Sequence, residues 1–167
     1  IIEAHPEKAQ QLEMAYEKWW EGLQKDMLQE NRIVVGAPQS NPTLLTSHDW
    51  HSDRDPAWHQ RHIRAGKTDN AHWTLDIAQA GNYRIRLYRW PLELEKAMNA
   101  TVAEGDVIDG GSPFKEGVSL EVVESKIVVQ DEVFFSKEII EDRYFEFTVS
   151  LEQKPISFQT FMTDKDV

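Results

Sequence analysis

The chain has 167 residues, 40% of them hydrophobic, which suits one domain with an ordinary buried core. Its 18 Lys and Arg against 29 Asp and Glu give a formal net charge of −11, and such an acidic surface repels phosphate backbones, so we expect no nucleic-acid partner. The sequence has no cysteine, which excludes disulfides, zinc–thiolate sites and cysteine nucleophiles. Its apolar runs are only a few residues long, so we expect no membrane span.

The N-terminal stretch predicts one helix over residues 6–30. The chain starts at Ile1 without an initiator methionine or a signal-type apolar region, which indicates a piece cut from a longer protein. Pro6 suits the first helical position. An apolar stripe then recurs at helical spacing: Leu12, Tyr16, Trp19, Leu23 and Met27, with Trp20 widening it. This stripe packs either on the chain's own sheet or on a neighbouring domain.

After the helix, the apolar period changes to two. Short strands are expected at 32–36, 73–77, 83–88, 118–123, 126–129, 133–135, 145–151 and 156–162. Gly81-Asn82 indicates a hairpin turn, and residues 37–70 and 105–117 read as long loops. Many short strands separated by turns predict a mainly β fold, an antiparallel β-sandwich of jelly-roll type preceded by one N-terminal α-helix. We expect residues 1–167 to form a single domain, with the helix at 6–30 and the sandwich at 31–167.

Three motifs resemble the C-terminal region of bacterial arylsulfatase-type sulfatases. The first is His5-Pro6-Glu7 leading into Tyr16-Glu17-Lys18-Trp19-Trp20. The second runs from Asn41-Pro42 to Leu45-Thr46-Ser47-His48-Asp49-Trp50, and the third runs from Gly81 to Arg89-Trp90-Pro91. In that family such a helix follows the catalytic domain and a β-rich tail comes next. The resemblance spans about residues 5–91.

The resemblance implies chemistry that this chain does not carry. The family's catalytic motif is Cys or Ser followed by x-Pro-x-Arg, its first residue is oxidised to formylglycine, and Asp and Asn side chains hold a calcium ion. The only Ser-x-Pro here, beginning at Ser40, has Leu44 where the motif needs Arg. No catalytic residue and no metal ligand of the family maps onto the sequence. We therefore expect this piece to be inactive and to need no cofactor of its own, and the family implies a periplasmic or secreted location.

Arginines and aromatic residues gather on one predicted strand. Arg84, Arg86 and Tyr88 point away from Tyr83, Ile85 and Leu87, and by the same alternation Trp90 continues their face. Arginine binds sulfate or carboxylate through a fork of donors. The candidate contact residues, for a catalytic domain or a sulfated carbohydrate, are Arg84, Arg86, Tyr88, Arg89 and Trp90. The alternative is that the arginines form salt bridges to acidic residues on adjacent strands.

Two loops contain residue types that bind metals. The segment His48 to Asp55 is rich in His and Asp, with His59 and His62 following, but it lacks any fixed ligand spacing, so a solvated loop is favoured. Asp106 and Asp109 lie in a Gly-rich loop without an EF-hand pattern. We expect no metal site in either.

Three functions remain open. The favoured hypothesis is a non-catalytic C-terminal domain of a sulfatase, which packs on the catalytic domain of the same chain and helps to shape its substrate cleft. The second is a carbohydrate-binding module that folds and binds alone, because the strand pattern also resembles galactose-binding-type jelly rolls. The third is a free-standing hydrolase that uses paired carboxylates.

Overall fold

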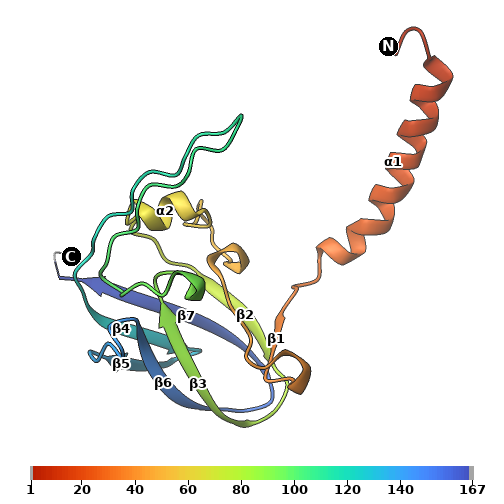
Figure 1. Ribbon diagram of the computed structural model, residues 1–167. Helices are drawn as coiled ribbons and strands as arrows, with labels where there is room; N and C mark the ends of the chain where they lie inside the picture. Colours follow the sequence, from red (N-terminus) through yellow and green to blue (C-terminus); the bar gives the residue numbers. More distant parts are fainter. Residues whose placement is uncertain (1, 166–167) are drawn as a thin grey trace. The chain divides into compact units, whose positions relative to one another are not determined.

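The computed structural model describes residues 2–165 and divides the chain into two compact units, 1–31 and 32–167. The first unit consists of helix α1 (Pro6–Met27), shown in red and orange in Figure 1. Pro6 lies in its first turn, and acidic Glu7 and basic Lys25 lie at the ends where each favours the helix dipole. The helix ends three residues before the predicted boundary.

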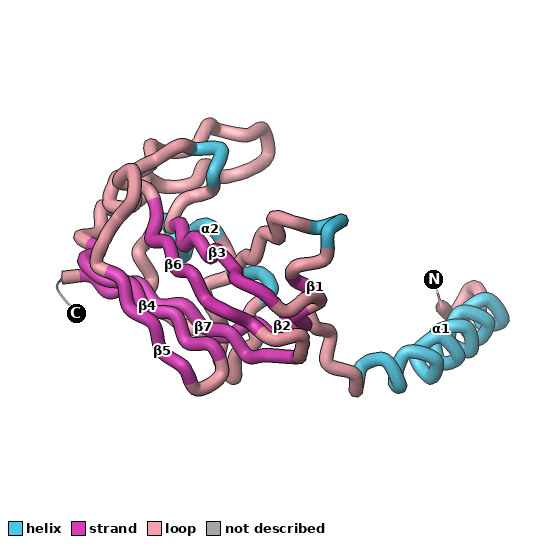
Figure 2. The backbone as a smooth tube through the Cα atoms, turned by 90° about the horizontal axis from the view of Figure 1, so that it is seen from below, coloured by secondary structure: helices cyan, strands magenta, loops and turns pink. Residues whose placement is uncertain are grey.

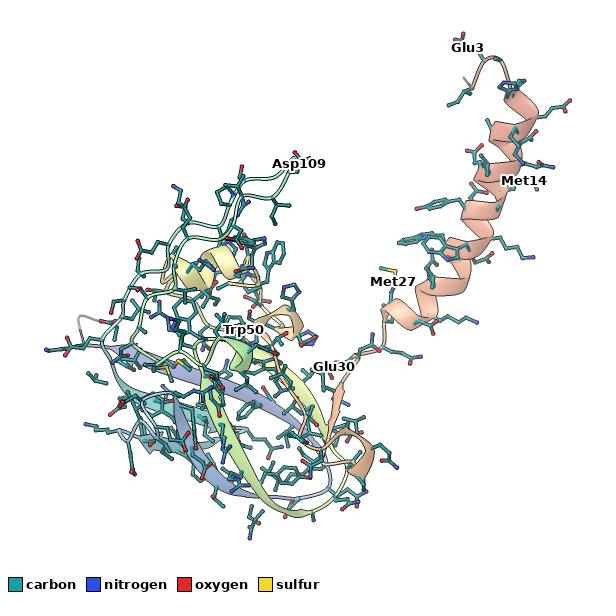
Figure 3. All side chains as sticks on the ribbon, in the orientation of Figure 1. Glu3, Met14, Met27, Glu30, Trp50 and Asp109 are labelled. Carbon is teal, nitrogen blue, oxygen red and sulfur yellow. The ribbon has the colours of Figure 1, made fainter. Side chains whose placement is uncertain are left out.

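No residue of α1 is buried, although its apolar stripe has the predicted spacing. Leu12, Tyr16 and Trp19 are 57–60% exposed. The rings of Tyr16, Trp19 and Trp20 contact one another, with centroids 5.7 to 6.4 Å apart. Figure 3 shows the side chains along this helix, with Met14 and Met27 labelled.

The second unit is a sandwich of two β-sheets, which lie in separate layers in Figure 2. The larger sheet has the order β1-β2-β7-β4-β5, and the smaller pairs β3 with β6. All pairs are antiparallel except β1 with β2. The strands are β1 (Ile33–Val35), β2 (His72–Ile77), β3 (Gly81–Tyr88), β4 (Val122–Val129), β5 (Glu132–Ser136), β6 (Tyr144–Leu151) and β7 (Pro155–Asp164). The predicted fold, mainly β with one N-terminal helix, is confirmed; the jelly-roll assignment stays a prediction.

The core lies between the two sheets and follows the period-two pattern of the strands. Strand β6 buries Phe145, Phe147, Val149 and Leu151, which alternate with more exposed residues. Facing residues come from the larger sheet, where Ile77 and Ile127 are fully buried. The whole buried cluster is drawn from the second unit, so the sandwich has its own core.

Two strand predictions need correction. Gly81-Asn82 is not a hairpin turn, because β2 and β3 belong to different sheets and the chain crosses between them at residues 78–80. The expected strand 126–129 is part of one longer strand, β4, which begins at Val122, and residues 118–121 of the other expected strand lie outside it. Ser125 fits inside it without exposure because its hydroxyl donates to the Phe161 carbonyl at 2.9 Å.

The long connection between β1 and β2 packs against the sandwich. It contains two 3₁₀ turns, Pro38–Ser40 and Ser47–Asp49, and the short helix α2 (Gln60–Arg64). His51 pairs with His72 through two backbone hydrogen bonds, which extends the sheet along the edge of β2 beyond β1. The Trp73 indole donates to the Thr46 carbonyl at 2.8 Å. Throughout residues 2–165, no helix is long and apolar enough to cross a bilayer.

Candidate functional site

The outer face of the β3–β6 sheet carries the predicted arginines. Arg84 and Arg86 are exposed, and they face away from Tyr83, Ile85 and Leu87 as expected. The register places Arg86 opposite Glu146 and Tyr88 opposite Tyr144. We call Arg84, Arg86, Tyr88 and their partners Tyr144 and Glu146 the arginine face.

Glu146 contacts both arginines of the arginine face. Its carboxylate accepts a hydrogen bond from Arg86 Nε at 2.7 Å and lies 4.0 Å from Arg84 Nε. The hydrogen bond raises the pKa of Arg86 above its ordinary value. The Arg86 guanidinium also lies over the Tyr144 ring, 4.8 Å from its centroid. The salt-bridge alternative therefore describes these side chains well, and Glu146 offsets part of the charge that an anionic ligand would meet.

Arg89 and Trp90 do not continue the arginine face. Trp90 is only 5% exposed and its indole donates to the Ala100 carbonyl at 3.2 Å. Arg89 lies over the Trp90 ring, 4.4 Å from its centroid, and donates to the Val118 carbonyl at 2.7 Å. Burial lowers the pKa of Arg89, against the opposing charge of Asp164. Both side chains contact the segment that leads to β4. They depart from the predicted face because β3 ends at Tyr88, and its alternation of side chains ends there.

A hairpin-like loop rises beside α2 in Figure 1. Backbone hydrogen bonds join Gly117 to Val102 at 2.7 Å and Gly105 to Phe114 at 2.8 Å, and Asp109 lies at the tip in Figure 3. Arg64 fastens α2 to this loop by donating to the carbonyls of Ala103 and Lys115 at 2.8 and 2.9 Å.

An aromatic and basic cluster forms where α2 meets this loop, and sequence reasoning missed it. Trp58 is 45% exposed. Its ring contacts the imidazoles of His48, His59 and His62, and His59 also contacts Phe114. The only sequence signal was the density of His and Trp between residues 48 and 62. We call Trp58, His48, His59, His62 and Arg61 the Trp58 cluster.

The two loops that carry metal-binding residue types were not expected to hold a metal ion. Within residues 2–165, no three His, Asp or Glu side chains are grouped so that they could hold a metal ion. His51 is engaged at the sheet edge, where its Nε2 lies 3.2 Å from the Thr74 hydroxyl. The Asp49 carboxylate accepts a hydrogen bond from Thr46 at 3.1 Å.

No family model, curated protein or solved structure matches this chain. The sequence motifs and the geometry described above therefore carry the functional proposal.

Proposed function

We propose that this chain is the non-catalytic C-terminal part of a sulfatase, a sulfuric ester hydrolase. In this proposal α1 packs on the catalytic domain and the β-sandwich helps to shape the substrate cleft. Calcium and formylglycine belong to the catalytic domain, and the whole enzyme works in the periplasm or outside the cell. The proposal rests on the three sequence motifs and on the exposed stripe of α1.

The stripe of α1 is the observation that carries the proposal. Tyr16, Trp19 and Trp20 are 58%, 57% and 38% exposed and lie together on one helix. Single exposed apolar residues are ordinary, but a contiguous aromatic patch is typical of an interaction site. The resemblance supplies the partner, since the helix with this motif follows the catalytic domain in the family.

The other two motifs have structural roles that fit an accessory domain. Trp50, which closes the second motif, packs edge-on against Trp73 at 5.5 Å. Trp90, in the third, is buried beneath the loop that leads to β4, with its ring against Gly117. These residues hold loops on the sandwich, a role that needs no catalytic group in this chain.

The alternative is a carbohydrate-binding module that acts alone. Its support is the β-sandwich fold together with exposed Arg84 and Arg86. Because fold alone does not confer function, and Glu146 occupies these arginines, we favour the accessory domain.

The test is an activity assay of the purified 167-residue chain. With a chromogenic aryl sulfate and calcium we expect no turnover, because the chain has neither the Cys or Ser-x-Pro-x-Arg motif nor the associated ligands. Calcium-dependent turnover that persists after a second purification, and that a mock preparation lacks, would contradict the proposal.

A further inference from the structure

Trp58 lies at the centre of three imidazole rings. The ring centroids of His48, His59 and His62 lie 5.6, 5.3 and 6.3 Å from that of Trp58, at interplanar angles of 83°, 81° and 85°. These edge-on contacts hold one part of the indole, while 45% of the Trp58 surface stays exposed to solvent. The cluster thus presents a partly exposed aromatic surface.

Two of the imidazoles accept backbone hydrogen bonds at Nδ1. His59 Nδ1 accepts a hydrogen bond from the Arg61 amide at 3.1 Å, and His62 Nδ1 accepts one from the His59 amide at 3.4 Å. A ring nitrogen that accepts a hydrogen bond carries no proton, so the proton of the neutral ring is on Nε2. Both rings therefore present an N–H donor at Nε2.

Arg61 adds a cation to these donors. Its side chain is exposed, and its guanidinium lies 5.8 Å from the centroid of the Phe114 ring. The guanidinium of Arg64 lies 5.7 Å from the same centroid but donates to two loop carbonyls, so its role is structural. The nearby Asp49 carboxylate is hydrogen-bonded to Thr46. The cluster therefore combines one exposed cation with imidazole N–H donors.

We propose that the Trp58 cluster binds a sugar ring that carries a sulfate or carboxylate group. The indole gives the apolar face of the sugar a flat surface, and Arg61 with the Nε2 donors of His59 and His62 meets the anion. The biological role of this site rests on the proposed function. The site adds a place where the accessory domain would bind an anionic carbohydrate.

The test is a titration of the 167-residue chain with galactose 6-sulfate, glucuronic acid and galactose, followed by NMR of the indole N–H and imidazole signals. We expect saturable shifts at Trp58, His59 and His62 with at least one of the two anionic sugars, and none with galactose at the same concentrations. Shifts with the sulfated sugar, the uronic acid or both identify which anion the site accepts, and each supports the site.

Arg61→Gln is the decisive variant. Removal of one charge-assisted hydrogen bond predicts a loss of affinity of about tenfold or more. Arg84→Gln on the arginine face is the matched control and should bind like the unmodified chain. Arg61 is exposed, so this variant should fold, which its thermal unfolding verifies. Equal binding of galactose, absence of saturation with both anionic sugars, or unchanged affinity in Arg61→Gln would overturn the site.

The two proposals fail separately. The aryl sulfate assay does not depend on the Trp58 cluster, and the titration does not depend on an upstream catalytic domain. A chain that binds the anionic sugar without belonging to a sulfatase would keep the site and lose the proposed function.

Discussion

Glu146 determines the chemistry of the arginine face. One carboxylate lies 2.7 Å from Arg86 and 4.0 Å from Arg84, so part of the positive charge of both is offset within the sheet. Such exposed ion pairs contribute little to stability, but they reduce the attraction of a ligand's negative charge. The arginines that made β3 a candidate binding face in the sequence are therefore engaged by a glutamate of the neighbouring strand β6.

Asp69 gives the fold an expected pH dependence. Burial works against its charged form, but the ion pair with Lys67 at 3.1 Å, the hydrogen bond from the Asn70 amide and the charge of Arg54 outweigh it and lower the pKa of Asp69. A lowered folded pKa stabilises the fold above the unfolded pKa of about 4, and this stabilisation is lost as the pH falls through the folded pKa.

The variant that tests this is Asp69→Asn. Its deficit in free energy of unfolding relative to the unmodified chain should be greatest near neutral pH and should shrink below about pH 4. Urea unfolding at a series of pH values measures it, and Lys67→Met should show the same trend. A deficit that stays constant with pH would show that Asp69 does not titrate in this way.

At the scale of elements, the turn after β1 depends on a glycine. Gly36 has a φ of +83°, and a Cβ there would collide with the Tyr83 ring, whose hydroxyl donates to the Gln79 carbonyl at 2.7 Å. Gly110, at the tip of the loop beside α2, has a φ of +74° but nothing within 4 Å of its Cβ position.

Comparing substitutions at these two glycines distinguishes the cost of a left-handed backbone from the cost of a steric collision. Gly110→Ala should cost about 1–2 kcal/mol for the left-handed backbone alone, whereas Gly36→Ala should cost about 1–3 kcal/mol more because Tyr83 must also move. Urea unfolding of both variants gives the comparison. Equal losses would mean that Tyr83 moves aside without cost.

Helix α1 should tolerate the loss of a large aromatic side chain. Trp19 is 57% exposed, so Trp19→Ala should change the free energy of unfolding of this chain by less than about 1 kcal/mol. Phe145→Ala, at a fully buried position of β6, is the matched control and should cost about 3–5 kcal/mol. Circular dichroism during urea unfolding distinguishes them. A loss at Trp19 as large as that at Phe145 would show that the helix is buried.

The sequence correctly predicted the features that depend on local periodicity, such as which side chains of a strand face outward. Alternation in β3 placed Arg84 and Arg86 outward correctly, because one face of that strand covers the core. It could not place Trp90, because β3 ends at Tyr88 and the loop that covers Trp90 comes from residues 100–117. The Trp58 cluster was equally unpredictable, since it depends on contacts among residues 48, 58–62 and 114, which only the tertiary fold brings together.

For the whole molecule, the main feature is the contrast between its two units. The sandwich buries a continuous core drawn from residues of both sheets. Helix α1 buries none of its residues, yet carries Leu12, Tyr16, Trp19 and Trp20 in one stripe. Burial of such side chains is worth about 1.5–3 kcal/mol each, so a partner that covers the stripe would be bound with substantial apolar stabilisation. Our account assigns that partner to a catalytic domain of the same chain.

The most direct test of this assignment is to determine the coding sequence immediately upstream of the codon for Ile1. The account predicts that the reading frame continues upstream and encodes a domain with Cys or Ser followed by x-Pro-x-Arg, along with acidic and amide residues that would bind calcium. A start codon directly before Ile1, or an upstream domain without that motif, would contradict the central claim.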